Sequence, residues 1–157
     1  MENDILSEKI RKQYQTEVHD ALEKCQFVEE TLRVCISLAI DIASKKVGNV
    51  FPIRFTESDL SKLSLGKLTA IFSPLTDNTS LKSSLHKITT ERNYVAHRSL
   101  LFTIGDLQDP IKLSESAKKM EGIKKRAKDV HEELLAETWR LRKERSALRR
   151  HRESPSP

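Results

Sequence analysis

Three polar residues within one short stretch, Arg92, Asn93 and His97, carry side chains from which a phosphate-handling site can be built. The planar guanidinium of arginine grips two phosphate oxygens and stays charged at any working pH. Histidine, with an unperturbed pKa near ~6.5, gives or takes a proton near neutrality, and asparagine can orient the imidazole or a substrate hydroxyl. No cluster of acidic, His or Cys residues with metal-ligand spacing accompanies them. The expected chemistry therefore needs neither a metal nor another cofactor.

The segment that carries these residues is predicted to be a helix from about Ser80 to Leu100. Its apolar residues recur at steps of three and four, and they are Leu81, Leu85, Ile88 and Val95. Arg92 occupies the position on the same stripe between Ile88 and Val95. A charge on the core stripe of a helix is unfavourable unless it is paired. We therefore expect a carboxylate from another element to lie beside Arg92.

That carboxylate is expected from the first long helix, where Glu29 and Glu30 are adjacent. Glu29 is the preferred partner because it lies on the Cys25 and Leu32 side of that helix. A glutamate that fixes Arg92 would support the site as well as the fold. The alternative is a purely structural ion pair that ties the first helix to the third.

Asn93 and His97 are four residues apart and share a helix face. Arg92 and His97 are about 140° apart round the helix axis, and the long arginine stem can close that gap toward Asn93. The three side chains are therefore expected to converge on one small polar site. In the alternative, His97 is an interface residue that caps the helix end. Tyr94 is either a packed interface aromatic or a platform on which a base stacks.

The run Arg92-Asn93-Tyr94-Val95-Ala96-His97 resembles the signature of the HEPN superfamily. That signature is an arginine followed by a polar residue and then a histidine, commonly in the form RNxxAH. Two further segments are similar to HEPN chains. Residues 26–32 of the first helix contain a glutamate, and residues 63–68 (LSLGKL) resemble the "TLGxL" opening of the second helix. The order and spacing of these segments cover residues 5–150.

The resemblance implies an α-helical bundle that pairs as a homodimer and brings two copies of the motif together in a cleft. Many HEPN proteins are metal-independent endoribonucleases, among them toxins of toxin–antitoxin pairs and effectors of phage defence. Arg92, Asn93 and His97 would then be catalytic, with Glu29 in support and RNA as substrate. The expected products are 2′,3′-cyclic phosphate and 5′-hydroxyl ends. An antitoxin or other regulatory protein is a further candidate partner. The alternative is a non-catalytic HEPN module that binds RNA or a partner protein.

The composition excludes an all-β protein and favours a helical one. Only 4 Gly and 5 Pro occur in 157 residues, too few breakers for a turn-rich sandwich or barrel. Apolar spacing predicts one HEPN-like domain over residues 1–152, an all-α bundle of about four main helices. The first helix (about 5–47) and the last (about 114–150) are the long ones, and residues 153–157 form a disordered tail.

The connections between these helices follow from Gly, Pro and Asp positions. Gly48-Asn49 is predicted to stop the first helix, and Pro52 favours an extended connector after it. A short helical piece is expected to open near residue 57 and to be closed by Pro74, and Asp109-Pro110 are expected to act as breakers before the last helix. The apolar stripes of the two outer helices are longer than a four-helix bundle of one chain is expected to bury. A second copy of the chain is therefore predicted to cover them.

The positive charge is concentrated in the last helix. The chain has 28 Lys and Arg against 23 Asp and Glu, a net charge of +5, and 13 of the basic residues lie between Lys118 and Arg152, against six acidic ones. A basic helix end can hold RNA phosphates, and we assign this contact to Arg149, Arg150 and Arg152. The alternative is a solvated helix end.

No apolar run approaches the ~20 residues needed to span a bilayer, and the acidic N-terminus lacks a signal-peptide layout. The two cysteines, Cys25 and Cys35, do not form a CxxC pair. We expect them to be small core residues of a reduced, cytoplasmic protein without a membrane partner.

Overall fold

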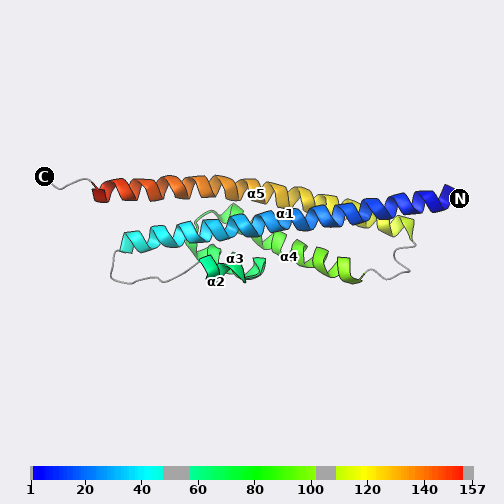
Figure 1. Cartoon of the computed structure of the whole chain (residues 1–157), viewed down its shortest axis with the longest axis horizontal. Helices are drawn as coiled ribbons and strands as arrows, with labels where there is room; N and C mark the ends of the chain where they lie inside the picture. Colours follow the sequence, from blue (N-terminus) through cyan, green and yellow to red (C-terminus); the bar gives the residue numbers. More distant parts are fainter. Residues whose placement is uncertain (1, 48–56, 102–108, 154–157) are drawn as a thin grey trace.

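A computed structural model describes residues 2–47, 57–101 and 109–153, and the side chains of residues 8–47, 58–98 and 109–150. These residues form α1 (Glu2–Val47), α2 (Glu57–Ser61), α3 (Leu65–Phe72), the 3₁₀ turn η2 (Ser73–Leu75), α4 (Thr79–Leu101) and α5 (Pro110–Glu153). The described part of the chain contains no strand. The prediction of an all-α bundle with long first and last helices is confirmed (Figure 1).

The two long helices run parallel, side by side along the length of the molecule (Figure 1). Lys124 pairs with Glu17 near one end, and the side chain of Thr138 contacts that of Cys35 further along. The two residues of the first contact are 107 positions apart in the sequence, and those of the second are 103 apart. Because this separation is nearly constant along the pair, both helices advance in the same direction. Because the long helices point the same way, the shorter elements must return the chain along one side of them.

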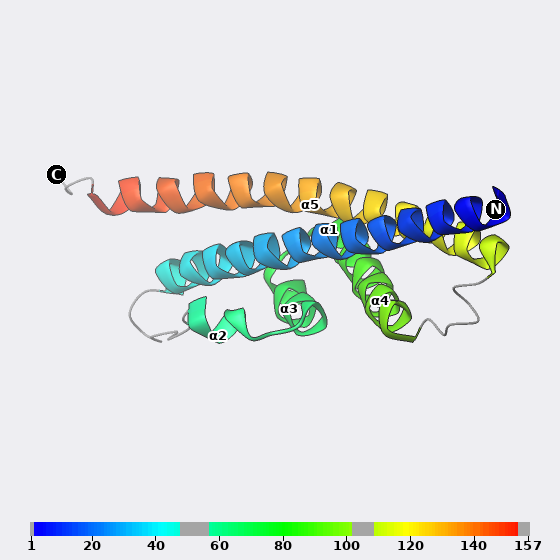
Figure 2. The same cartoon turned by 45° about the vertical axis from the view of Figure 1, so that its right-hand side comes forward.

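That return is made by α3 and α4, which lie together against one side of the α1–α5 pair (Figure 2). Thr76, just before α4, contacts Glu137, whereas Glu91 near the other end of α4 pairs with Arg126. The partner on α5 moves backward as α4 moves forward, so the two helices are antiparallel. This crossing brings the Arg92 turn of α4 against α1.

The apolar stripes expected from the sequence form a single core. The residues of the first-helix stripe that are buried are Tyr14, Val18, Ala21, Cys25, Val28, Leu32, Cys35, Ala39 and Ile42. On α5 the seam from Met120 to Leu141 is buried as well, at an ordinary gain of about 1.5–3 kcal/mol for each large apolar side chain. The expectation that these stripes need a second copy to cover them is therefore wrong, because α1 and α5 cover each other.

The predicted short inner helix is divided in two. The sequence predicts one helical piece up to Phe72, but the structure has α2, a break at residues 62–64, and then α3. The Arg33 side chain of α1 donates to the backbone carbonyls of Leu60 and Leu63, at 3.2 Å and 3.3 Å. This long-range capping satisfies carbonyls at the end of α2, which the local sequence cannot reveal.

The start of the last helix also differs from its prediction. Asp109-Pro110 do not break the chain before a helix at residue 114, because α5 begins at Pro110 itself. The Asp109 carboxylate accepts hydrogen bonds from the backbone N–H groups of Ile111 and Lys112, at 3.0 Å and 3.1 Å. Proline suits the first position of a helix, where no N–H partner is needed, and aspartate is a good N-cap. The pair is therefore a start signal.

Several predicted features lie outside the described residues. They are the stop at Gly48-Asn49, the extended connector around Pro52 and the tail at 154–157, whereas Glu153 of the predicted tail is helical. The predicted division of the chain into one domain and a tail stays a prediction.

Candidate functional site

Arg92 of α4 is paired with a carboxylate of α1, as its place on the apolar stripe requires. Its Nε lies 3.4 Å from Oε1 of Glu29. The Glu29 side chain is only 14% exposed, whereas that of Arg92 is 36% exposed. The guanidinium is thus held by the Glu29 carboxylate of α1 and still reaches solvent. This geometry leaves N–H donors of the guanidinium available for an anion.

Glu29 has a second arginine beside it that the sequence analysis did not identify. Nη2 of Arg33, one turn later on α1, lies 3.6 Å from Oε2 of Glu29. Arg33 also pairs with Glu30, at 2.7 Å, and caps α2. The four-residue spacing of Glu29 and Arg33 is a recognisable helical pair in the sequence, but its link to α2 depends on the fold. Glu29 is therefore a bridge between two cations on different helices.

Asn93 and His97 lie on the outer face of α4 and both are exposed. Within the described part of the chain, no hydrogen bond or ion pair joins Arg92 to Asn93 or His97. The three residues share one and a half turns of a helix without closing on each other. A single chain thus offers an open polar surface at this place, and the predicted convergence is not locked by direct contacts.

On the α5 side of that surface, Tyr94 is half-buried under a lysine. Lys119 of α5 places Nζ 3.6 Å from the ring centroid, and Nε of Arg98 donates to the phenol oxygen at 3.3 Å. Because the ammonium covers one face of the ring, that face is not a platform for a base. Burial is the largest single influence on the pKa of Tyr94 and raises it, but the hydrogen bonds and positive charges of Arg98 and Lys119 together leave this pKa below its ordinary value.

The neighbouring residue Glu91 points to α5. Its Oε1 lies 2.7 Å from Nη2 of Arg126, and Nε of Arg126 donates to Oε2 at 3.0 Å. This bidentate pair joins α4 to α5, as the Arg92–Glu29 pair joins α4 to α1. The motif turn is therefore held from both long helices.

The two cysteines are core residues, as predicted. Cys25 and Cys35 are both buried and neither is in a disulfide. Burial raises the pKa of Cys25 to about 12 and that of Cys35 to about 11, although the nearby Arg92 pulls the first of these down and a hydrogen bond with Thr138 the second. Both thiols are protonated at neutral pH, a poor state for a nucleophile.

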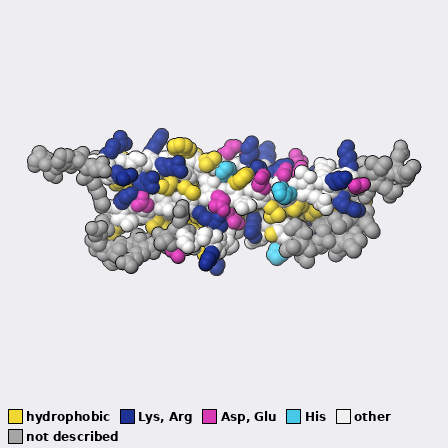
Figure 3. Space-filling view, in the orientation of Figure 1, with side chains coloured by type: hydrophobic (Ala, Val, Ile, Leu, Met, Phe, Trp, Pro, Cys, Tyr) yellow, Lys and Arg dark blue, Asp and Glu magenta, His cyan; other side chains and the backbone are white. Residues whose placement is uncertain are grey.

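The basic end of α5 contains arginines that pair with carboxylates and arginines that are exposed. Arg140 is held by Glu137 and Glu144, and Arg145 lies 3.8 Å from Asp41. Arg149 and Arg150 are exposed, and the side chain of Arg152 lies outside the described residues. Lys and Arg side chains are spread along the whole length of the face in Figure 3. Of the three arginines predicted to contact RNA, Arg149 and Arg150 therefore have described side chains, and both are exposed.

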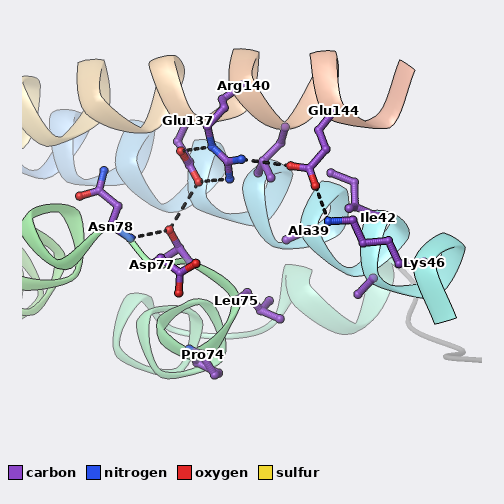
Figure 4. A pocket seen from close by; sticks show the side chains of 13 residues that line it. Ala39, Ile42, Lys46, Pro74, Leu75, Asp77, Asn78, Glu137, Arg140 and Glu144 are labelled. Atoms are coloured by element: carbon purple, nitrogen blue, oxygen red, sulfur yellow. Dashed lines mark hydrogen bonds and ion pairs between the residues drawn. The ribbon is translucent and has the colours of Figure 1, made fainter. Parts of the chain in front are cut away.

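Away from the RNYVAH run, a cavity of about 580 Å³ lies between α1, α5 and the residues that precede α4. Glu137, Arg140 and Glu144 extend into it from α5 toward Lys46 (Figure 4). Arg140 binds Glu137 in two places, at 2.8 Å and 2.9 Å, and Lys46 donates to Glu144 at 2.6 Å. These charges satisfy one another, so the network serves first to fasten the three segments together.

Among the described residues, no group of three or more His, Cys, Asp or Glu side chains is arranged to hold a metal ion. In the same part of the chain, no helix combines the length and apolar character that crossing a bilayer requires. No family model, no curated protein and no solved structure matches the chain.

Proposed function

We propose that this protein is a metal-independent endoribonuclease of the HEPN type. The observation that carries the proposal is the Arg92–Glu29 pair, which fixes a solvent-reaching guanidinium on the same helix as the exposed Asn93 and His97. The RNYVAH run that resembles the HEPN signature supports it. A purely structural arginine would not need the two adjoining exposed polar residues of that signature.

In the proposed reaction, Arg92 holds the oxygens of the scissile phosphate. The ribose 2′-oxygen attacks phosphorus and forms a new P–O bond, while His97 accepts the 2′-hydroxyl proton. The P–O5′ bond breaks and the leaving oxygen takes a proton from a second histidine. The products are a 2′,3′-cyclic phosphate and a 5′-hydroxyl, and DNA is inert because it lacks the attacking hydroxyl.

The second histidine is proposed to come from a second copy of the chain. Each chain contributes one His97, and the described residues around its exposed side chain form no wall that would exclude water from the reacting groups. A homodimer with the α4 helices near its two-fold axis would supply both the second histidine and the missing wall. An RNA-cutting enzyme of this kind would act in the cytoplasm, with an antitoxin or other regulatory protein to restrain it.

The decisive experiment incubates the purified protein with a pool of RNAs in EDTA, beside two variants. His97→Ala should lower the rate on the order of 10²–10⁴-fold and keep the fold, because this side chain is exposed. Arg92→Ala should cost more activity and also some stability, because Glu29 then loses one of its two cations. Cleavage that EDTA abolishes, or full activity in His97→Ala, would sink the proposal.

The second candidate is a non-catalytic module that binds RNA or a partner protein through the same face of α4. In the described part of the chain Arg92 and His97 make no direct contact, and this observation favours the non-catalytic module as a second candidate. It predicts that wild type binds RNA yet cuts none. In that case His97→Ala should weaken binding in a gel shift, and end-group analysis should detect no cleavage product with either protein.

A further inference from the structure

One aromatic ring beside the His97 face brings together cations from two helices. Lys119 of α5 lies over the ring of Tyr94, and Arg98, one turn further along α4, donates to the hydroxyl of the same residue. Both cationic side chains are exposed although the ring is half-buried. Tyr94 therefore acts as a spacer that holds two cations side by side where α4 meets α5.

The lysine of this cluster is not neutralised by any carboxylate among the described side chains. No Asp or Glu side chain in the described part of the chain lies within ion-pair distance of Lys119. Lys124, five residues later on α5, is the contrast, because Glu17 and Asp20 lie 2.6 Å and 3.5 Å from its Nζ. The lowered pKa of Tyr94 is consistent with a positive local potential.

The cluster flanks His97 on the side opposite to Arg92. Successive residues turn by about 100° round a helix, which puts Tyr94 about 60° from His97 in one direction and Arg92 about 140° from it in the other. A chain of phosphates that crosses α4 at His97 therefore has a cation on each side. Arg92 is held in place by Glu29, and Arg98 and Lys119 are held together by Tyr94.

We propose that Arg98 and Lys119, supported by Tyr94, form a second phosphate subsite that binds the single-stranded RNA backbone next to the cleaved bond. The direction of the strand across α4 rests on the proposed function. The recognition itself is electrostatic: it takes the backbone phosphate of any sequence and is weakened by salt. The ring of Tyr94 is a support for the cations, since Lys119 already covers one of its faces.

The test measures binding of a short single-stranded RNA of mixed sequence that carries 2′-O-methyl groups and so cannot be cleaved. Kd is measured over a range of salt concentrations for wild type and for Arg98→Gln/Lys119→Gln. The double variant should bind more weakly at low salt. The slope of log Kd against log salt should fall in magnitude by about 0.7–1.4, because one or two phosphates are no longer neutralised.

The matched control is Lys125→Gln/Lys128→Gln, which likewise removes two positive charges, both from α5, the helix that carries Lys119. Lys128 is nine residues from Lys119, half a turn round α5, and both control lysines are exposed. They line a separate hollow between α5 and Lys24 of α1. The control should keep the wild-type slope. If the slope of log Kd against log salt falls in the control and stays at the wild-type value in Arg98→Gln/Lys119→Gln, the RNA backbone runs through that hollow. The subsite is then overturned.

Cleavage of unmodified RNA is scored separately, so that the two proposals can fail independently. A wild type that binds the probe with the expected slope change but cuts no RNA leaves the subsite standing and removes the ribonuclease. A wild type that cuts RNA but shows no slope change in the double variant overturns the subsite alone. Failure of wild type to bind the probe also overturns it. Circular dichroism and urea unfolding verify the fold, and Lys119→Gln alone repeats the measurement if the double variant is less stable.

Discussion

Glu29 lies between two arginines of different helices, with Arg92 Nε 3.4 Å from one carboxylate oxygen and Arg33 Nη2 3.6 Å from the other. Arg92 belongs to α4, and Arg33, on α1 itself, caps α2. One half-buried carboxylate thus connects the proposed site to the packing of three helices. Its loss should be felt in both stability and activity.

Glu29→Gln should lower the free energy of unfolding by about 1–2 kcal/mol, because two guanidinium groups lose the partly buried carboxylate charge that faces them. Activity should fall by up to about 10²-fold, since Arg92 is then misplaced. Urea unfolding and the cleavage assay measure the two effects. Glu30→Gln is the control: its side chain is 62% exposed and, among the described residues, pairs with Arg33 alone, so a change within about 0.5 kcal/mol is expected. Equal effects in both variants would contradict the bridging role.

Wild type should have twice the mass of one chain by light scattering at micromolar concentration. The prediction rests on the open Asn93–His97 surface and not on the apolar stripes of the outer helices, because those stripes are buried within one chain. Asn93→Arg, which adds a charge beside a two-fold axis, should shift the mass toward one chain. A single-chain mass for wild type would remove the second histidine from the proposed mechanism.

Removal of the arginines at the end of α5 should weaken RNA binding. In Arg149→Gln/Arg150→Gln/Arg152→Gln, the slope of log Kd against log salt should fall in magnitude by about 0.7 for each phosphate that is no longer neutralised. The fold should be kept, because Arg149 and Arg150 are exposed and follow the apolar seam. A wild-type slope in this triple variant would assign the helix end to solvent.

Acid should loosen the Lys46–Glu144–Arg140 network. The hydrogen bond from Lys46 is the main cause that holds the pKa of Glu144 below its ordinary 4.5, against a smaller opposing effect of burial, and Arg140 adds to it. A carboxylate with a lowered pKa stabilises the fold above its unfolded pKa, and this contribution disappears as the pH falls through its folded pKa.

Wild type should therefore lose more stability than Glu144→Gln between about pH 5 and pH 3, as urea unfolding at each pH will show. Glu132→Gln is the control, because this exposed carboxylate has only a 3.9 Å contact with Lys128. Its pH profile should follow wild type. If Glu144→Gln has the wild-type profile too, the network contributes nothing to folding in acid.

The sequence determined the helices and their buried faces. Apolar residues at helical spacing placed the first helix to within a few residues and identified the core residues of α1, α4 and α5. It also determined that Arg92 must have a partner, because a charge on a core stripe is unfavourable alone. The preference for Glu29 over Glu30 came from helix geometry and agrees with the observed ion pair.

Tertiary structure alone decided how these helices meet. The parallel pairing of α1 with α5 buries the stripes for which spacing alone predicts a second copy, and the long-range caps from Arg33 divide α2 from α3. Likewise, the contact of Lys119 with Tyr94 joins residues of different helices. Spacing along a chain reports which side chains share a face of one helix. It contains no information on which face of another helix will lie opposite, because that is set by the packing of the whole core.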